Sequence, residues 1–79
     1  MTSVYTFPNL TLAEKGNLVF NEGNYLAVRQ YYGYFINLYL VEDTFVEVWY
    51  QREENKIEKI EILDDMKKLD LYIMSMQNL

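Results

Sequence analysis

The middle of the chain alternates between apolar and polar side chains with a period of two residues. Positions 24–63 are rich in β-branched and aromatic residues, contain no proline, and are broken at short intervals by polar turn residues. This composition is typical of strands joined by hairpins. It predicts strands at 24–30, 34–41, 45–52 and 56–63, which pair in chain order as an antiparallel meander.

The lengths of the turns predict how these strands pair. The three breaks cover residues 31–33, 42–44 and 53–55. Gly33 and Asn55 suit the left-handed residue of a three-residue hairpin loop, whereas Thr44 suits it poorly and its loop could differ in length. Three-residue loops pair even-numbered residues with even-numbered ones, and odd with odd. The even face then collects the core residues Leu26, Val28, Ile36, Leu38, Leu40, Val46, Val48, Tyr50, Ile60 and Ile62.

A first helix is predicted before the strands. Thr11 and Glu14 have the spacing of a capping box, and Gly23 suits a left-handed residue just past a helix end. The helix therefore extends from Thr11 to Gly23. Gly16 is unfavourable inside it, so the alternative is a shorter helix followed by a strand at 17–20.

A second helix is predicted after the strands, capped by Asp64 or Asp65. Its apolar residues recur at spacings of three and four: Met66, Leu69, Tyr72 or Ile73, and Met76. The fold class is therefore α+β, with an α-β-β-β-β-α order in one domain covering residues 1–79. Both helices are expected to pack on the even face, and residues 1–10 to form a loose N-terminal segment.

The odd-numbered face of the sheet would then remain uncovered. It carries Tyr, Trp, Phe and Arg, the residue types that are enriched where proteins meet. The opposing interpretation is that aromatic residues favour strands and that antiparallel sheets often leave one face in water. The candidate interaction surface consists of Tyr25, Arg29, Phe35, Asn37, Tyr39, Glu47, Trp49, Lys59 and Glu61, and Ala27, Phe45 and Ile57 share its face.

The same register places charged and aromatic residues opposite one another. The expected pairs are Tyr25–Tyr39, Tyr39–Glu47, Glu47–Glu61 and Trp49–Lys59. Two carboxylates in close approach can act as acid and base, but ordinary charge pairing of Glu47 with Lys59 or Arg29 is favoured over catalysis. Lys59 over Trp49 predicts a cation–π contact.

Composition narrows the chemistry further. The chain has no cysteine and no histidine, which excludes disulfides, thiolate and imidazole catalysis and the usual zinc ligands. We therefore expect no catalytic residues, no metal and no cofactor. The net charge of −5 disfavours nucleic-acid binding, because it repels phosphate. No signal peptide or long apolar run is visible, so a cytoplasmic protein without membrane contact is expected.

The central half of the chain also resembles known sequences. Residues 29–39, followed by 45–50 and 57–61, are similar to short bacterial proteins of uncharacterised families. This resemblance implies a bacterial origin. It implies no active site, cofactor or partner.

The sequence therefore predicts a non-enzymatic protein-interaction module. It would self-associate as a homodimer, or bind another protein, through the odd face. One alternative is an acidic inhibitor or immunity-type protein that blocks a basic partner with the carboxylates between Glu42 and Glu61. Another is a small-molecule binder with a tyrosine-lined pocket between a helix and the sheet. An enzyme is the least favoured class.

Overall fold

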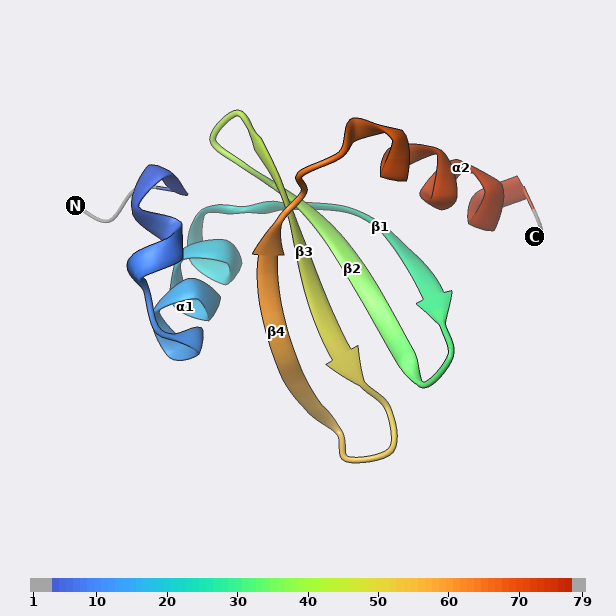
Figure 1. The fold of residues 1–79 in the computed structure, drawn as a ribbon, viewed down its shortest axis with the longest axis horizontal. Coiled ribbons are helices and arrows are strands. Elements are labelled where there is room, and N and C mark those ends of the chain that lie inside the picture. Colours follow the sequence, from blue (N-terminus) through green and yellow to red (C-terminus); the bar gives the residue numbers. More distant parts are fainter. Residues whose placement is uncertain (1–3, 78–79) are drawn as a thin grey trace.

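A computed structural model describes the backbone of residues 4–77 and the side chains of residues 6–74. Its centre is a four-stranded antiparallel sheet in the order β1-β2-β3-β4 (Figure 1). The strands are β1 (Asn24–Tyr31), β2 (Tyr34–Val41), β3 (Thr44–Gln51) and β4 (Lys56–Ile62). Helices precede and follow the sheet, so the predicted α+β class and α-β-β-β-β-α order are confirmed.

The first α-helix, α1 (Leu12–Glu22), begins at the predicted capping box. The Glu14 amide donates to Thr11 Oγ1 at 3.2 Å, and the Thr11 amide donates to Glu14 Oε1 at 2.9 Å. Residues 17–20 are helical, so the alternative strand there is wrong. The helix ends before Gly23 as expected, but Gly23 is extended (φ −84°) rather than left-handed. A glycine is needed because a Cβ would collide with the backbone of the preceding helical turn.

The segment before α1 is ordered against the body of the protein. Residues Val4–Asn9 form a 3₁₀ helix, η1, and Phe7 within it is buried beside Leu18 and Val19 of α1. The predicted loose segment is therefore wrong for residues 4–9, because one buried aromatic ring anchors it. Residues 1–3 lie outside the described part of the chain.

The C-terminal helical segment has two parts, η2 (Met66–Lys68) and α2 (Leu69–Gln77). Asp65, one of the two predicted caps, accepts a hydrogen bond from the Lys67 amide at 3.0 Å. Among the predicted inward-facing residues, Leu69 and Tyr72 do pack on the sheet, while Met66 and Ile73 are exposed and the side chain of Met76 lies outside the described residues.

All three hairpin loops differ from the predicted length of three residues. Two residues, Tyr32 and Gly33, join β1 to β2, and two, Glu42 and Asp43, join β2 to β3. Four residues, 52–55, join β3 to β4. Tyr32 and Glu42 adopt positive φ angles of 51° and 58°, a left-handed conformation that residues other than glycine visit less often. The tight loops therefore form at positions where residue type alone does not favour them.

The two-residue loops change the parity of the pairing. Between β2 and β3, Leu38 pairs with Glu47 and Tyr39 pairs with Val46, so the predicted Tyr39–Glu47 pair is wrong. Bulges in β1 and β4 shift the register by one residue elsewhere. The predicted pairs Tyr25–Tyr39, Glu47–Glu61 and Trp49–Lys59 are confirmed.

Because paired residues share a face, this register mixes odd and even positions and gives the sheet two buried faces. Phe7, Leu18 and Val19 of η1 and α1 pack on one of them, the α1 face, which carries Val41, Val46, Val48 and Ile60. Tyr72 and Leu69 of α2 pack on the other, the α2 face, which carries Ile36, Leu38, Ala27, Tyr34, Phe45 and Trp49. The expectation that both helices cover one aliphatic face is therefore wrong.

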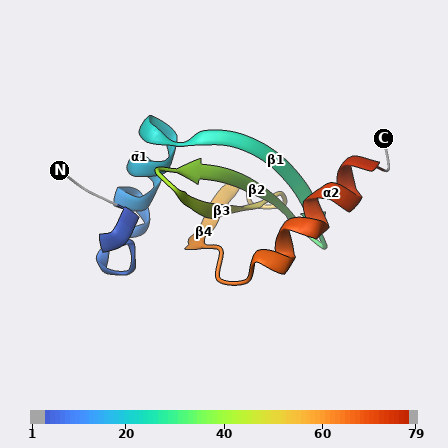
Figure 2. The ribbon, with the colours of Figure 1, turned by 90° about the horizontal axis from the view of Figure 1, so that it is seen from above.

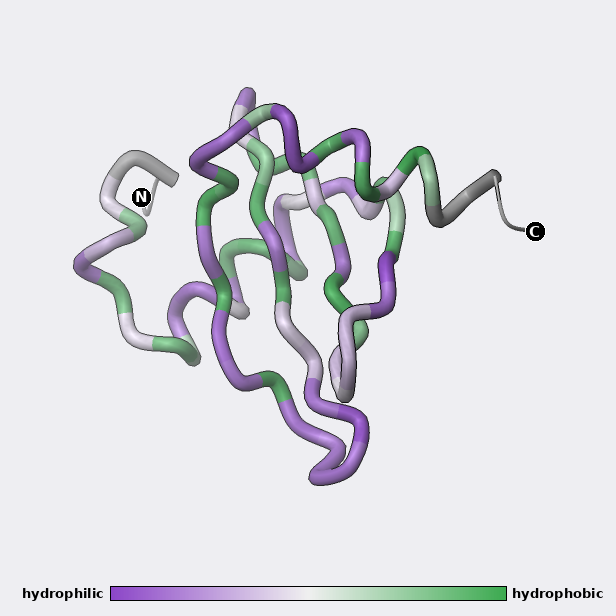
Figure 3. The backbone as a smooth tube through the Cα atoms, turned by 45° about the vertical axis from the view of Figure 1, so that its right-hand side comes forward, coloured by the Kyte–Doolittle hydropathy of each residue, from purple (hydrophilic) through white to green (hydrophobic). Residues whose placement is uncertain are grey.

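The helices also cover different halves of the sheet. α1 contacts β4 and β2, whereas α2 contacts β1 (Figures 1 and 2). On the α1 face, β1 lies outside the main contacts of α1, and on the α2 face, β4 lies outside the main contacts of α2. We call the β1–β2 part of the α1 face and the β3–β4 part of the α2 face the two open halves. The hairpin between β3 and β4 projects as a hydrophilic tip, visible in purple in Figure 3.

Candidate functional site

The nine residues of the predicted interaction surface fall on two faces of the sheet. Tyr25, Phe35, Asn37 and Tyr39 lie on the α1 face, while Arg29, Glu47, Trp49, Lys59 and Glu61 lie on the α2 face. The single uncovered aromatic face expected from the sequence therefore does not exist. Its two parts have different surroundings and different chemistry.

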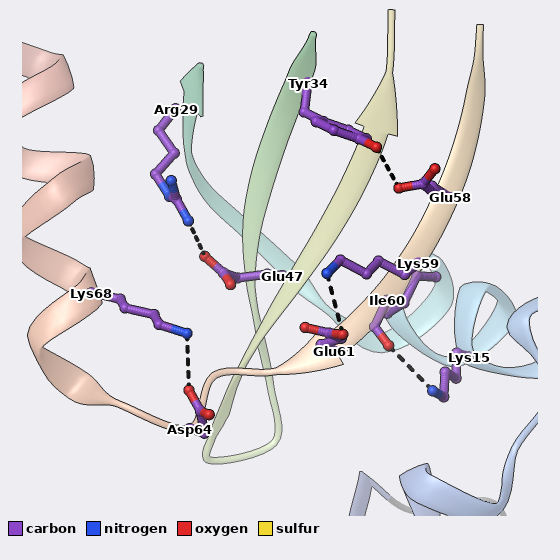
Figure 4. A network of polar contacts seen from close by, with 10 residues as sticks. All are labelled: Lys15, Arg29, Tyr34, Glu47, Glu58, Lys59, Ile60, Glu61, Asp64 and Lys68. Atoms are coloured by element: carbon purple, nitrogen blue, oxygen red, sulfur yellow. Dashed lines mark hydrogen bonds and ion pairs between the residues drawn. The ribbon is translucent and has the colours of Figure 1, made fainter. Parts of the chain in front are cut away.

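On the α2 face, Glu47 is a buried carboxylate that joins three elements. It is 3 % exposed, lies 3.4 Å from Arg29 Nη2 and accepts a hydrogen bond from Tyr72 Oη at 2.6 Å (Figure 4 shows the Arg29 contact). Burial, reinforced by the hydrogen bond to Glu47, raises the pKa of the Tyr72 hydroxyl well above its ordinary value. Tyr72 is therefore a permanent donor at neutral pH, and the cluster links α2 to β1 and β3.

The Arg29 guanidinium is surrounded by aromatic rings. Its Cζ lies 5.4 Å from the ring centroid of Tyr72 and 5.9 Å from those of Tyr31 and Trp49. Arg29 Nε and Trp49 Nε1 are buried and have no acceptor among the described residues. This aromatic cage is therefore already filled by a cation of its own chain, which favours a structural role.

The paired carboxylates do not form a shared acid–base site. Glu47 and Glu61 are opposite in register, but Glu61 is exposed and pairs with Lys59 at 3.5 Å (Figure 4). Each carboxylate thus has its own cation, Arg29 for Glu47 and Lys59 for Glu61. The geometry matches ordinary charge pairing, with the cation on Glu47 being Arg29.

On the open β3–β4 half of the α2 face, the charged and aromatic side chains contact other side chains of the same chain. Lys59 Nζ lies 4.1 Å from the Trp49 ring centroid, which confirms the predicted cation–π contact. Trp49 also meets the edges of Tyr31 and Tyr34, with centroids 5.9 and 5.3 Å apart. Tyr34 Oη donates to Glu58 at 2.6 Å, and this bond raises the pKa of the hydroxyl.

The open β1–β2 half of the α1 face is apolar and exposed. Tyr25, Leu26 and Val28 of β1 are 54 %, 46 % and 37 % exposed, and Phe20 of α1 is 49 % exposed. Leu26 is the unpaired residue of the β1 bulge, between Tyr25, which pairs with Tyr39 on the α1 face, and Ala27, which belongs to the opposite core. We call these four residues the β1 patch.

Aromatic contacts connect the patch to its surroundings. Tyr39 lies between Phe20 and Tyr25, with ring centroids 5.7 and 5.6 Å away in edge-to-face geometry. Burial raises the pKa of the Tyr39 hydroxyl. At the other end of β2, the Arg52 guanidinium stacks over Phe35 at 4.7 Å. Between these two contacts, the α1 face of β2 carries the uncharged Asn37.

An apolar groove lies beside α1. It has a volume of about 390 Å³ and is lined by Leu12, Ala13, Gly16, Asn17, Phe20, Ile57 and Ile60. The small-molecule interpretation expected tyrosines in such a place, and the lining of this groove has none. Small-molecule binding remains an untested prediction.

The sequence identified only part of these surfaces. Phe20, Leu26 and Val28 were expected to lie in a helix or in the core, and Tyr72 only to pack. The available signal was Thr44, whose poor fit to a three-residue loop indicated that the register there could differ. On α2, the apolar side chains of Leu71, Ile73 and Met74 are also exposed.

Comparison with protein-family models, with curated proteins and with solved structures finds no match to this chain. Within residues 4–77, no helix has the length and apolar character needed to cross a membrane. In the same range, no group of three His, Cys, Asp or Glu side chains is arranged to hold a metal ion.

Proposed function

We propose that this protein is a non-enzymatic protein–protein interaction module whose contact surface is the β1 patch. The observation that carries the proposal is the exposure of four apolar side chains near one another, Phe20 of α1 and Tyr25, Leu26 and Val28 of β1. Contiguous exposed apolar side chains mark interaction sites on soluble proteins.

The chemistry of the patch supports recognition by apolar contact. Its four side chains are uncharged, and Tyr25 and Phe20 each meet Tyr39, so their rings are partly pre-positioned. Ordered aromatic residues provide contact area at a low entropic cost. Of the predicted surface, Tyr25 belongs to the patch, and Phe35, Asn37 and Tyr39 lie beside it on the same face. Its α2-face members contact other side chains of the chain.

The acidic-inhibitor alternative has less support. Among the carboxylates between Glu42 and Glu61, Glu47 is buried, and Glu54, Glu58 and Glu61 contact Lys56, Tyr34 and Lys59. Carboxylates engaged within the chain contribute less to the capture of a basic partner. No observation raises this alternative, or an enzyme, above the interaction module.

The test is to place a charge in the patch. Leu26→Asp should abolish concentration-dependent association in sedimentation velocity, and also binding to any purified partner, because a carboxylate cannot be desolvated in an apolar contact. The matched control is Tyr32→Asp, since Tyr32 is the most exposed aromatic residue among those whose side chains are described and lies in the β1–β2 loop outside the patch. Association that is unchanged in Leu26→Asp, or equally reduced in both variants, would refute the proposal.

A further inference from the structure

We infer that the partner of the β1 patch is a second copy of this chain, packed face to face across a twofold axis. This inference rests on the proposed function and adds the identity and geometry of the partner. The observation behind it is the distribution of charge around the patch.

The α1-face surface of β2 between Phe35 and Tyr39 has residues of opposite charge near its two ends. Arg52 stacks over Phe35 at one end. Glu22, the last residue of α1, marks the other end, since the following Gly23 lies against Tyr39. Neither Glu22 nor Arg52 forms an ion pair within the described part of the chain. Both charges are therefore available to a partner.

The residues between these ends carry no charge. On β2, Phe35 and Tyr39 are four residues apart, so the ends are separated by roughly 13 Å. The α1-face side chains between them are Tyr25, Val28, Gln30 and Asn37, and the unpaired bulge residue Leu26 is uncharged as well. A chain with a net charge of −5 can therefore meet another copy here without bringing carboxylates together in the middle of the contact.

A twofold axis makes this pattern self-complementary. In an isologous contact, the same surface of each copy faces the other, and the two surfaces run in opposite directions. With the axis crossing the centre of the patch, Arg52 of each copy meets Glu22 of the other, and the apolar side chains meet in between. Two sheets packed face to face at about 10 Å have the geometry that such a contact needs. The gain is large for a chain this small, because a domain of its length buries only about 60 % of its unfolded surface.

Charge reversal tests this arrangement. In Glu22→Arg or Arg52→Glu alone, both ends of the symmetric contact become repulsive, so we expect the dimer dissociation constant in sedimentation equilibrium to rise about tenfold. An equimolar mixture of the two single variants should return to within twofold of wild type, because each end then pairs opposite charges. The double variant Glu22→Arg/Arg52→Glu should also dimerise like wild type.

Asp70→Lys is the matched control, because it changes the net charge by the same amount as Glu22→Arg but lies on α2. It should leave the dissociation constant unchanged. Single reversals without effect, a mixture that does not recover, or a dimer lost in Leu71→Asp instead of Leu26→Asp would each overturn the inference. A monomeric wild type whose other purified partner is lost in Leu26→Asp would overturn it while leaving the proposed function standing.

Discussion

The two open halves of the sheet differ in whether their side chains are held in contacts within the chain. On the α2 face, the β3–β4 half holds Trp49 under Lys59, and Lys59 pairs with Glu61. On the α1 face, the β1–β2 half leaves the apolar side chains of Tyr25 and Val28 exposed. The aromatic and charged side chains of the first half are paired within the monomer, whereas the apolar side chains of the second half remain exposed. Exposed aromatic residues alone therefore do not identify a contact surface, and the contacts of each ring decide.

The two edge strands show the same contrast. β4 alternates Lys56, Glu58, Lys59 and Glu61 with apolar residues and contains a bulge at Glu58, both of which discourage edge-to-edge pairing. β1 carries a single charged residue, and that residue, Arg29, is turned inward to Glu47. Protection against association is concentrated on the β4 side of the molecule.

The largest expected effect comes from the buried charge on the completed side. Glu47→Ala should destabilise the protein by about 3–5 kcal/mol, because it leaves the Arg29 guanidinium buried without its carboxylate. Urea denaturation measures this loss. Glu61→Ala, at the paired but exposed position, should remain close to wild type. Equal losses in the two variants would contradict the different roles assigned to these carboxylates.

A smaller effect is expected from the hydroxyl that joins α2 to this cluster. Tyr72→Phe should cost about 1–3 kcal/mol, because the buried Glu47 loses a charge-assisted hydrogen bond. Tyr34→Phe, which removes an exposed bond to Glu58, is the control and should leave the unfolding midpoint unchanged.

The pH dependence of stability tests whether the Tyr72 hydroxyl contributes beyond the packing of its ring. Its pKa is raised in the folded state, so its contribution to stability is fully present below pH 10, the ordinary pKa, and declines above it as the unfolded chain loses the proton first. The slope is at most about 1.4 kcal/mol per pH unit. Urea unfolding between pH 9 and 11 should show a steeper decline in wild type than in Tyr72→Phe. Parallel declines would contradict the burial of this hydroxyl.

The smallest effect concerns the contact between Lys59 and Trp49 on the open half of the α2 face. Lys59→Met should cost about 0.5–1 kcal/mol through the lost cation–π contact with Trp49, and should alter tryptophan fluorescence. Lys67→Met, at an exposed position on η2, provides the comparison. Trp49 emission that stays the same in Lys59→Met would show that the ammonium does not rest on the ring in solution.

Local signals predicted the elements of this fold well. Thr11 and Glu14 form their capping box, Asp65 caps the last helical segment, and the four strands lie within about one residue of the predicted bounds, because these features depend on neighbours in the chain. The candidate site was predicted less well. Tyr25 and Tyr39 remain beside the proposed contact, but Glu47 and Trp49 belong to the internal cluster.

What the sequence by itself determined was where strands and helices lie, since a period of two or of three to four apolar residues acts over short distances. The tertiary structure alone decided which side each strand turns to which helix. Loops at Tyr32 and Glu42 that are one residue shorter than expected reverse the parity of pairing, and only packing of the whole chain favours their left-handed backbone. That single-residue difference placed Glu47 beneath α2, and the bulge in β1 left Leu26 exposed.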